Sequence, residues 1–321
     1  MSKPLLSNRL LGRTGLLVSP LCIGGAPLGD MPETFNYSTT EENALATIRA
    51  AFAGPINFLD TAAAYGDGES ERRIGKVIKE NGGLPSGYVL ATKADRCLQT
   101  GDFSGEQIKR SIEGSLLRLG LDRLQYVYIH DPEHTTFENV MGPSGPLEVL
   151  KSFKDQGVID HIGISGGPIQ MLIRYVETGE FSAVETHNRY TLLNRSAEPL
   201  LDVASRLGVA VINAAPYGSG MLAKGPDAYA RYAYSDAPQS LLERARLFVK
   251  VCQEYDVPLA AAALQFSMRD PRVTSTVVGM TKPERVAQTL ELASYSIPPE
   301  LWPALDAIGF DTDDPEANRF T

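Results

Sequence analysis

Cysteine is scarce in this sequence, and the few residues present form no pattern typical of a cysteine-based site. The three cysteines are Cys22, Cys97 and Cys252, an odd and widely spaced set that excludes a disulfide framework. The sequence has no C-x-x-C motif and no His/Cys cluster, so we expect no metal centre. These features favour a reducing, cytoplasmic environment.

Long apolar segments and an excess of positive charge are also missing. No apolar run approaches the roughly 20 residues that a membrane-spanning helix needs, and residues 1–9 lack the apolar core of a signal peptide. Lys and Arg total 30 against 39 Asp and Glu, giving a formal net charge of −9 and a pI near 5.1. Nucleic acids and anionic membranes require a basic surface, so neither is expected as a partner.

A dinucleotide-binding loop of the Rossmann type is absent as well. That motif reads G-x-G-x-x-G just after an early strand. The stretch after the first buried strand, Gly24–Gly29, does not have this spacing, and Gly218–Ala223 matches only loosely and late in the chain. A doubly wound nucleotide-binding sheet is therefore the less favoured of two parallel arrangements.

What the sequence does contain is a regular alternation of short apolar runs with longer stretches of helical spacing. We predict buried strands at Leu21–Gly24, Ile56–Leu59, Tyr88–Ala91, Tyr126–Ile129, His161–Ile164, Ala183–Thr186, Ala210–Asn213 and Thr276–Val278. We predict helices at about Thr40–Phe52, Glu69–Glu80, Ser104–Leu119, Pro146–Asp155, Ile169–Thr178, Ala197–Leu207, Gln239–Met268 (two helices) and Pro283–Ala293. Eight such units predict an α/β fold, a (β/α)8 TIM barrel that forms a single domain over 1–321. Two apolar segments flank Gly12–Gly15 and predict an N-terminal β-hairpin that closes the bottom of the barrel.

Polar residues stand at the C-terminal ends of the predicted strands, where a barrel of this kind holds its active site. Asp60 ends the second strand with Tyr65 just beyond it, Lys93 ends the third strand, and His130 ends the fourth. Taken singly, such residues are more often a helix cap, core packing, a solvated charge or a structural histidine.

At consecutive strand ends, however, these four residues form a set suited to proton transfer at a carbonyl or an alcohol. An ammonium group lowers the pKa of a neighbouring phenol, and a carboxylate beside the ammonium holds it charged and oriented. An imidazole opposite them can hydrogen-bond the substrate oxygen. Because the set contains no covalent nucleophile, hydride transfer with a cofactor is the expected reaction.

The same residues make the sequence resemble the aldo-keto reductases. The resemblance runs from about residue 9 to 310 and rests on blocks in the family's order: Asp60–Gly66 with Ser70, Glu71, Ile74 and Gly75, then Thr92 and Lys93, His130, Gly163–Ser165 and Gly279–Arg285. It implies a (β/α)8 barrel that binds NAD or NADP without a Rossmann motif. It also implies that Tyr65 is the general acid/base, that Lys93 and Asp60 tune it, and that His130 orients the substrate.

The resemblance further implies a dinucleotide site that is spread over several strand ends. The expected cofactor-binding residues are Gly25, Ala26, Ser165, Gly166, His187, Tyr217, Gly218, Ser219, Gly220, Leu222, Gly279, Met280, Thr281, Arg285, Gln288 and Thr289. The chain departs from the family pattern at Gly166, which replaces an Asn, at His187, which replaces a Gln, and at Ala214, which replaces a stacking Tyr. Gly279 replaces a basic residue that often binds the 2′-phosphate of NADPH, while Arg285 is retained. This pattern favours NAD or dual use.

Within the family, the chain resembles the sugar 1-dehydrogenase branch that includes D-threo-aldose (L-fucose) dehydrogenase and L-galactose dehydrogenase. The stretches concerned are Leu11–Gly15, Gly24–Gly29, His130–Pro132 and Arg189–Leu193. This implies a small-molecule substrate, an aldose whose C1 hemiacetal hydroxyl is oxidised to a lactone. Two alternatives stay open: an NADPH-dependent aldehyde, ketone or pyridoxal oxidoreductase, and a cofactor-binding regulatory subunit with little turnover. Asp131 is either a ligand of a sugar hydroxyl or a turn residue before Pro132.

Overall fold

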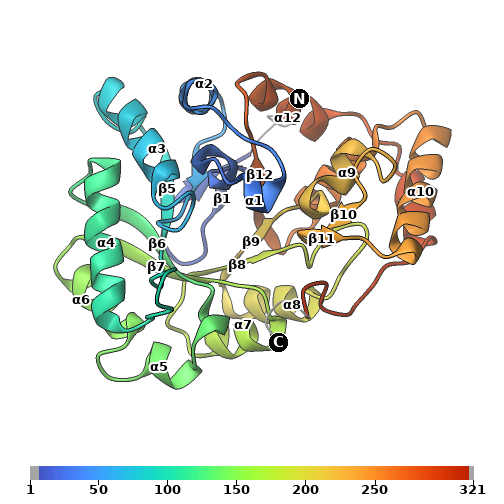
Figure 1. The fold of residues 1–321 in the computed structure, drawn as a ribbon. Helices are drawn as coiled ribbons and strands as arrows, with labels where there is room; N and C mark the ends of the chain where they lie inside the picture. The colour runs from blue at the N-terminus through green and yellow to red at the C-terminus, as the bar shows by residue number, and fades with distance from the viewer. Residues whose placement is uncertain (1–6, 318–321) are drawn as a thin grey trace.

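The computed structural model describes residues 7–317, and its centre is a closed barrel of eight parallel strands (Figure 1). In the order in which they pair around the barrel, the strands are β12 (Val273–Gly279), β3 (Leu21–Gly24), β4 (Phe58–Asp60), β5 (Val89–Ala94), β6 (Leu124–His130), β7 (Ile159–Ser165), β8 (Ala183–His187) and β9 (Ala210–Ala214). The predicted (β/α)8 barrel is confirmed. The expected single domain of 1–321 includes 1–6 and 318–321, which lie outside the described residues.

Helices surround the strands (Figure 1), because in a parallel barrel the chain must return to the same end before the next strand begins. The main helices are α2 (Glu41–Ala53), α3 (Glu69–Glu80), α4 (Gly105–Leu119), α6 (Pro146–Asp155), α7 (Ile169–Glu177), α8 (Glu198–Leu207), α10 (Gln239–Glu254), α11 (Leu259–Arg269) and α12 (Glu284–Ser294). Within 7–317, no helix combines the length and the apolar character needed to cross a bilayer.

Short elements occupy the loops, and the sequence analysis did not predict them. They are η1 (Ala26–Gly29), α1 (Pro32–Phe35), η2 (Pro132–His134), α5 (Phe137–Met141), η3 (Gly218–Gly220), α9 (Met221–Lys224), α13 (Leu301–Asp306) and the two-stranded ribbon of β10 (Arg231–Tyr232) and β11 (Ser235–Asp236). Each is only two to six residues long, too short to produce a periodic pattern in the sequence.

The predicted N-terminal hairpin is also confirmed, and it closes the bottom of the barrel. Strand β1 (Arg9–Leu10) pairs antiparallel with β2 (Leu17–Val18). Leu11 and Val18 are fully buried and pack in one apolar cluster with Phe58 and Ala210. Since Phe58 and Ala210 begin their strands, the hairpin lies against the N-terminal end of the barrel.

The side chains inside the barrel change from apolar at the bottom to polar at the top. Alternate residues of a strand face the same side, so the interior of each strand can be read in steps of two. The inward-facing series are Phe58 and Asp60 in β4; Val89, Ala91 and Lys93 in β5; Tyr126, Tyr128 and His130 in β6; and Ala183, Glu185 and His187 in β8. The apolar residues fill the core, and the last member of each series reaches the C-terminal mouth.

Candidate active site

The four residues predicted to be catalytic meet at the C-terminal mouth of the barrel. Lys93 Nζ lies 2.5 Å from Asp60 Oδ2 and 3.1 Å from the hydroxyl of Tyr65. The rings of Tyr65 and His130 meet edge to face, with their centroids 5.8 Å apart. Lys93 and Asp60 are almost completely buried. The structure therefore brings all four side chains together.

Close backbone packing fixes the loop that carries Tyr65. Gly66 has a φ of +63°, and a Cβ at this position would lie 1.9 Å from the carbonyl oxygen of Gly29. Only glycine fits both the left-handed conformation and this close approach. The N–H of Ser70 donates to the carbonyl oxygen of Tyr65 at 3.1 Å, and the N–H of Ala64 donates to Asp95 Oδ2 at 2.8 Å. These contacts hold the phenol over Lys93.

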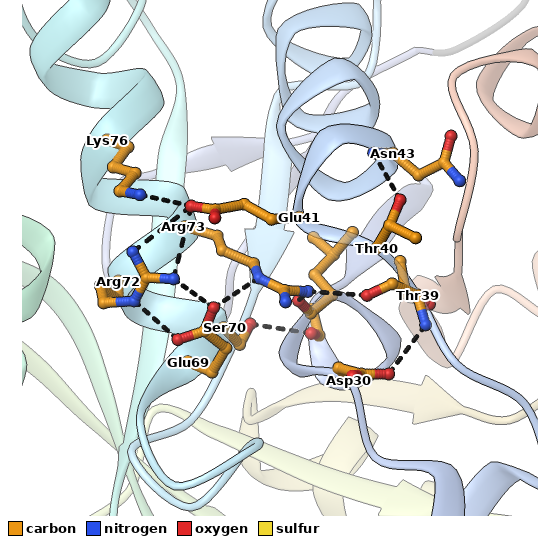
Figure 2. Close-up of polar contacts among 12 residues, drawn as sticks. Asp30, Thr39, Thr40, Glu41, Asn43, Glu69, Ser70, Arg72, Arg73 and Lys76 are labelled. Atoms are coloured by element: carbon orange, nitrogen blue, oxygen red, sulfur yellow. Dashed lines mark hydrogen bonds and ion pairs between the residues drawn. The ribbon is translucent and has the colours of Figure 1, made fainter.

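Helix α3 anchors the neighbouring loop, which includes Gly25 and η1. Ser70 Oγ donates to the carbonyl oxygen of Gly25 at 2.8 Å. The buried guanidinium of Arg73 donates to the carbonyl oxygens of Leu28 at 2.6 Å and Thr39 at 3.1 Å. Around it, ion pairs connect α3 with the start of α2 and involve Glu41, Glu69, Arg72 and Lys76 (Figure 2). Ser70 thus positions a predicted cofactor-binding loop.

A carboxylate that the sequence analysis missed holds His130. Asp95 Oδ1 lies 2.5 Å from His130 Nδ1. Burial lowers the pKa of His130, but the charges of Asp131 and Asp95 outweigh this and raise it to about 9. The imidazole is therefore protonated at neutral pH and can donate from Nε2. The available signal was that Asp95 stands two residues after Lys93, in the same inward-facing series.

A second missed carboxylate faces Lys93 from β8. Glu185 Oε1 lies 3.6 Å from Lys93 Nζ, and Glu185 is only 5% exposed. Burial lowers the pKa of Lys93, but Asp60 and Glu185 raise it well above its ordinary value, so the ammonium is charged. Glu185 lies two residues before His187, and this spacing was the signal that could have identified it.

The pKa of Tyr65 is raised, whereas the sequence analysis expected it to be lowered. Burial has the largest effect and raises this pKa; Lys93 lowers it, and the charges of Asp60 and Glu185 raise it further. The direction of the Lys93 effect was predicted correctly, but burial and the second carboxylate were not considered. Tyr65 is therefore a protonated phenol at neutral pH, the form that donates a proton to a carbonyl oxygen.

Predicted residues of the phosphate-binding region lie where β12 and β3 end side by side. Gly279 pairs with Gly24 across these strands. Gly25 and Met280, the next residues of the chain, therefore leave the two strands at adjacent positions. Helix α12 begins nearby with no side-chain cap on its first N–H groups. In its first turn Arg285 is exposed and donates to Gln288 Oε1 at 3.0 Å. The N–H groups of Arg285 and Val286 donate to the carbonyl oxygens of Lys282 and Pro283, so the exposed guanidinium is the group here that suits an anionic phosphate of a dinucleotide.

Other predicted cofactor-binding residues offer mainly backbone groups or lie within the core. The η3 turn has positive φ at Gly218, Ser219 and Gly220, and Ser219 Oγ donates to Asn188 Oδ1 at 3.1 Å. Leu222 and Met280 are fully buried as whole residues, and Thr289 is 5% exposed, so the structure leaves no surface of Leu222 or Met280 for a ligand to contact. The remaining members of this set are Ala26, in η1, and Thr281, which follows Met280.

One buried polar atom in this region has no hydrogen-bond partner among the described residues, namely the hydroxyl of Tyr217. Tyr217 immediately precedes η3. A buried hydroxyl without a partner is costly, and the polar groups of a dinucleotide are suitable partners. This observation also fits a cofactor at the mouth.

The predicted nicotinamide-binding residues stand on β7 and β8. Ser165 pairs with His130 on β6 and with Glu185 on β8, and the N–H of Gly166 donates to the carbonyl oxygen of Glu185 at 3.1 Å. His187 ends β8, with its Nε2 3.1 Å from Glu316 Oε1. Glu316 is 3% exposed and was missed because no local pattern relates it to a residue so distant in the chain.

These features combine a buried Lys–Asp pair against a phenol, a protonated imidazole, and loops that suit an extended anionic ligand. Together with the barrel they are typical of one class of protein, the NAD(P)-dependent oxidoreductases built on a (β/α)8 fold. Residues 20–309 match the Aldo/keto reductase family, and the chain belongs to that family. It is therefore an oxidoreductase that uses NAD(P)(H), as the resemblance of its motifs implied.

Curated relatives cover almost the whole chain. The D-threo-aldose 1-dehydrogenase of a Pseudomonas species is 31% identical over 91% of this chain and 94% of its own length. The L-galactose dehydrogenase of Arabidopsis thaliana is 32% identical over 94% of this chain and 93% of its own length. The pyridoxal 4-dehydrogenase of Microbacterium luteolum is 28% identical over 94% of this chain and 97% of its own length.

A solved structure has the same fold. The aldo-keto reductase AKR11C1 from Bacillus halodurans, in its holo form, aligns with a TM-score of 0.78 over 98% of this chain and 99% of its own length. The two sequences are 24% identical, so this likeness concerns the architecture alone.

Proposed function

We propose that this protein is a sugar 1-dehydrogenase that oxidises the C1 hemiacetal hydroxyl of an aldose to a lactone. The observation that carries the proposal is the Lys93–Tyr65 contact of 3.1 Å, with the imidazole of His130 beside the phenol. This arrangement moves a proton at a substrate oxygen without a covalent intermediate. The named relatives that act on D-threo-aldoses and L-galactose support the choice of substrate class.

In this proposal each side chain has one task. His130 donates from Nε2 to the substrate oxygen and fixes its approach. During oxidation Tyr65 accepts the hydroxyl proton after it has lost its own, and because its pKa is raised this direction is favoured by alkaline pH; during reduction the phenol donates its proton to the carbonyl oxygen. Lys93 stabilises the phenolate, and Asp60 keeps Lys93 charged at 2.5 Å. A bound nicotinamide dinucleotide supplies the hydride acceptor or donor.

The position of Asp131 favours the assignment of a polyhydroxylated substrate. It precedes η2 with a φ of 48° and makes no side-chain capping bond to that turn. Instead its Oδ1 lies 3.5 Å from His130 Nε2, and its Oδ2 lies 3.9 Å from Arg96 Nη1. A carboxylate at this place can accept a hydrogen bond from a hydroxyl next to the reacting carbon. Of the two interpretations of Asp131, we therefore favour the substrate contact.

For the cofactor we propose a preference for NAD over NADP. Gly279 offers no charge at the position where relatives of the family often carry a basic residue, so Arg285 is the guanidinium left in this region to bind a 2′-phosphate. One lost charge–phosphate contact weakens the binding of the phosphorylated cofactor.

The test is a panel of L-fucose, L-galactose, other aldoses and pyridoxal, each with NAD⁺ and NADP⁺, together with generic aldehydes plus NADPH. We expect the highest kcat/KM for an aldose with NAD⁺. A clear preference for aldehydes with NADPH, and no sugar oxidation, would show that the reductase alternative is correct. A preference for pyridoxal would be consistent with the Microbacterium relative and would contradict the sugar assignment. Tight dinucleotide binding without turnover of any compound would favour the regulatory alternative.

A further inference from the structure

Lys93 is enclosed by two carboxylates, of which only Asp60 has a task in the proposed proton transfer. Asp60 Oδ2 lies 2.5 Å from Lys93 Nζ, and Glu185 Oε1 lies 3.6 Å from the same atom. All three residues are at most 5% exposed. The other oxygens, Asp60 Oδ1 and Glu185 Oε2, are buried and have no hydrogen-bond partner among the described residues.

The groups that face this triad do not balance a second negative charge. Cys22 from β3 and Tyr128 from β6 interact with it electrostatically. Burial is the main cause that raises the pKa of the Cys22 thiol and of the Tyr128 phenol, so both are neutral. Tyr65 is a phenol, and the charge of His130 is paired with Asp95 at 2.5 Å. One ammonium therefore faces two carboxylates, a combination that favours retention of an additional proton.

We propose that Glu185 is a positioning residue whose charge makes Asp60 retain one exchangeable proton, and that this proton sets how readily Tyr65 gives up its own. With the proton bound, the triad is neutral. When the proton leaves, the triad has a net charge of −1 beneath the phenol. The inference rests on the proposed role of Tyr65 and adds a residue to it.

The geometry sets the size of the effect on Tyr65. Lys93 Nζ is 3.1 Å from the phenol oxygen and 3.6 Å from Glu185 Oε1, so the phenol and the second carboxylate are within about 7 Å of each other. At that distance one buried charge changes a proton affinity by about one pH unit or more, with an effective dielectric constant of ~20. The charged triad therefore keeps Tyr65 protonated to higher pH.

The electrostatics of Asp60 agree with this arrangement. Burial and the charge of Glu185 together raise the pKa of Asp60 to about 7, against the opposing effect of Lys93. A carboxyl whose pKa is higher in the folded state binds more protons there than in the unfolded chain. It therefore stabilises the fold below its unfolded pKa, and this stabilisation is lost as the pH rises through about 7.

The experiment compares the wild-type protein with Glu185→Gln and with Glu71→Gln as a matched control. Glu71 is equally buried, but it pairs with Thr92 and Arg118 and not with Lys93. Thermal melts from pH 5 to 8 need no substrate, so their outcome is independent of the assigned sugar. We expect the Tm of Glu185→Gln, relative to wild type, to increase across this range by on the order of 3 °C. Burial raises the pKa of Glu71 as well, so the melts of Glu71→Gln also change with pH, and the control readout for this variant is the pH at which kcat is half-maximal, which should stay at the wild-type value because Glu71 does not pair with Lys93.

A second readout is the pH profile of oxidation with the preferred substrate. We expect Glu185→Gln to reach half of its maximal kcat about one pH unit lower than wild type, and Glu185→Asp to restore the wild-type midpoint. If Glu185→Gln does not fold, two other results support the inference. They are a wild-type kcat midpoint in Glu185→Asp and a wild-type Tm that falls as the pH rises towards 7. A Tm difference that does not change with pH, or an unchanged kcat midpoint, would overturn it and leave Glu185 as a structural partner of Lys93.

Discussion

Replacement of Asp95 by asparagine tests how the site keeps His130 protonated. The 2.5 Å contact between Asp95 Oδ1 and His130 Nδ1 loses its charge in Asp95→Asn, while the shape of the side chain is kept. An opposite charge at this range shifts a pKa by about 1–3 units. The pKa of His130, which is about 9, should therefore fall to between about 6 and 8.

Two measurements follow this change. The chain has four histidines, so their imidazole C–H signals can be followed by NMR as the pH changes, with His130→Gln identifying the signal of interest. At pH 8 we also expect kcat/KM to fall by about 10- to 100-fold, because the imidazole no longer donates reliably to the substrate oxygen. Asp102→Asn is a matched control, because Asp102 contacts Ser104 and Arg110 and not His130.

The pH dependence of the free energy of unfolding gives an independent check on the raised pKa of His130. Because the pKa of His130 is raised from 6.5 to about 9 on folding, its contribution to stability is complete below pH 6.5 and is lost as the pH rises through about 9. Asp95→Asn should therefore lower Tm most below pH 6.5. The free energy of unfolding should fall there by ~1.4 kcal/mol for each unit by which the pKa of His130 falls. If the His130 signal of Asp95→Asn titrates within about 0.5 unit of wild type, our account of His130 is wrong.

Three further changes probe the loops around the site. Gly66→Ala places a Cβ 1.9 Å from the carbonyl oxygen of Gly29 at positive φ, so we expect the free energy of unfolding to fall by more than ~1 kcal/mol, with a lower Tm. We also expect kcat to fall while dinucleotide binding stays intact. An unchanged kcat would show that Tyr65 does not depend on this packing. Ser70→Ala removes the bond to the carbonyl oxygen of Gly25 and should weaken dinucleotide binding by about 3- to 10-fold in a fluorescence titration, since one neutral hydrogen bond is worth ~1 kcal/mol; unchanged affinity would separate this loop from the cofactor. Arg285→Ala should weaken NADP⁺ by about 10-fold and NAD⁺ by less, measured by calorimetry, and equal losses for both cofactors would exclude a contact with the 2′-phosphate.

The architecture could be predicted from the sequence because its signal is local. Each buried strand is a short apolar run, and each return segment has helical spacing, so the eight units could be counted without knowledge of their neighbours. Strand β3 spans Leu21–Gly24, as predicted. The second barrel strand, β4, spans Phe58–Asp60, whereas the prediction was Ile56–Leu59. Pairing with β3 and β5 determines where that strand begins and ends, and such pairing is a property of the whole barrel.

The site could be predicted only in part, because contacts across the barrel depend on the relative register of the strands. Asp60, Tyr65, Lys93 and His130 stand at strand ends and were found by position. The spacing of Glu185 two residues before His187 could have placed it inside the barrel, but it did not indicate that Glu185 would lie 3.6 Å from Lys93 Nζ.

The direction of the Tyr65 pKa shift was predicted incorrectly for a related reason. Burial and the combined charges of several strands determine the shift, and a single neighbour in the sequence does not. Glu316 is a further case, because it reaches His187 only through the course of the C-terminal segment over the mouth.

Tyr65→Phe tests most directly whether Tyr65 transfers the proton. The variant keeps the ring and its packing against His130 and removes only the hydroxyl that lies 3.1 Å from Lys93 Nζ. With the preferred substrate, we predict that kcat falls by about 10²- to 10⁴-fold, while the dissociation constant of the dinucleotide changes little. A Tyr65→Phe variant whose kcat stays within a few-fold of wild type would contradict the account.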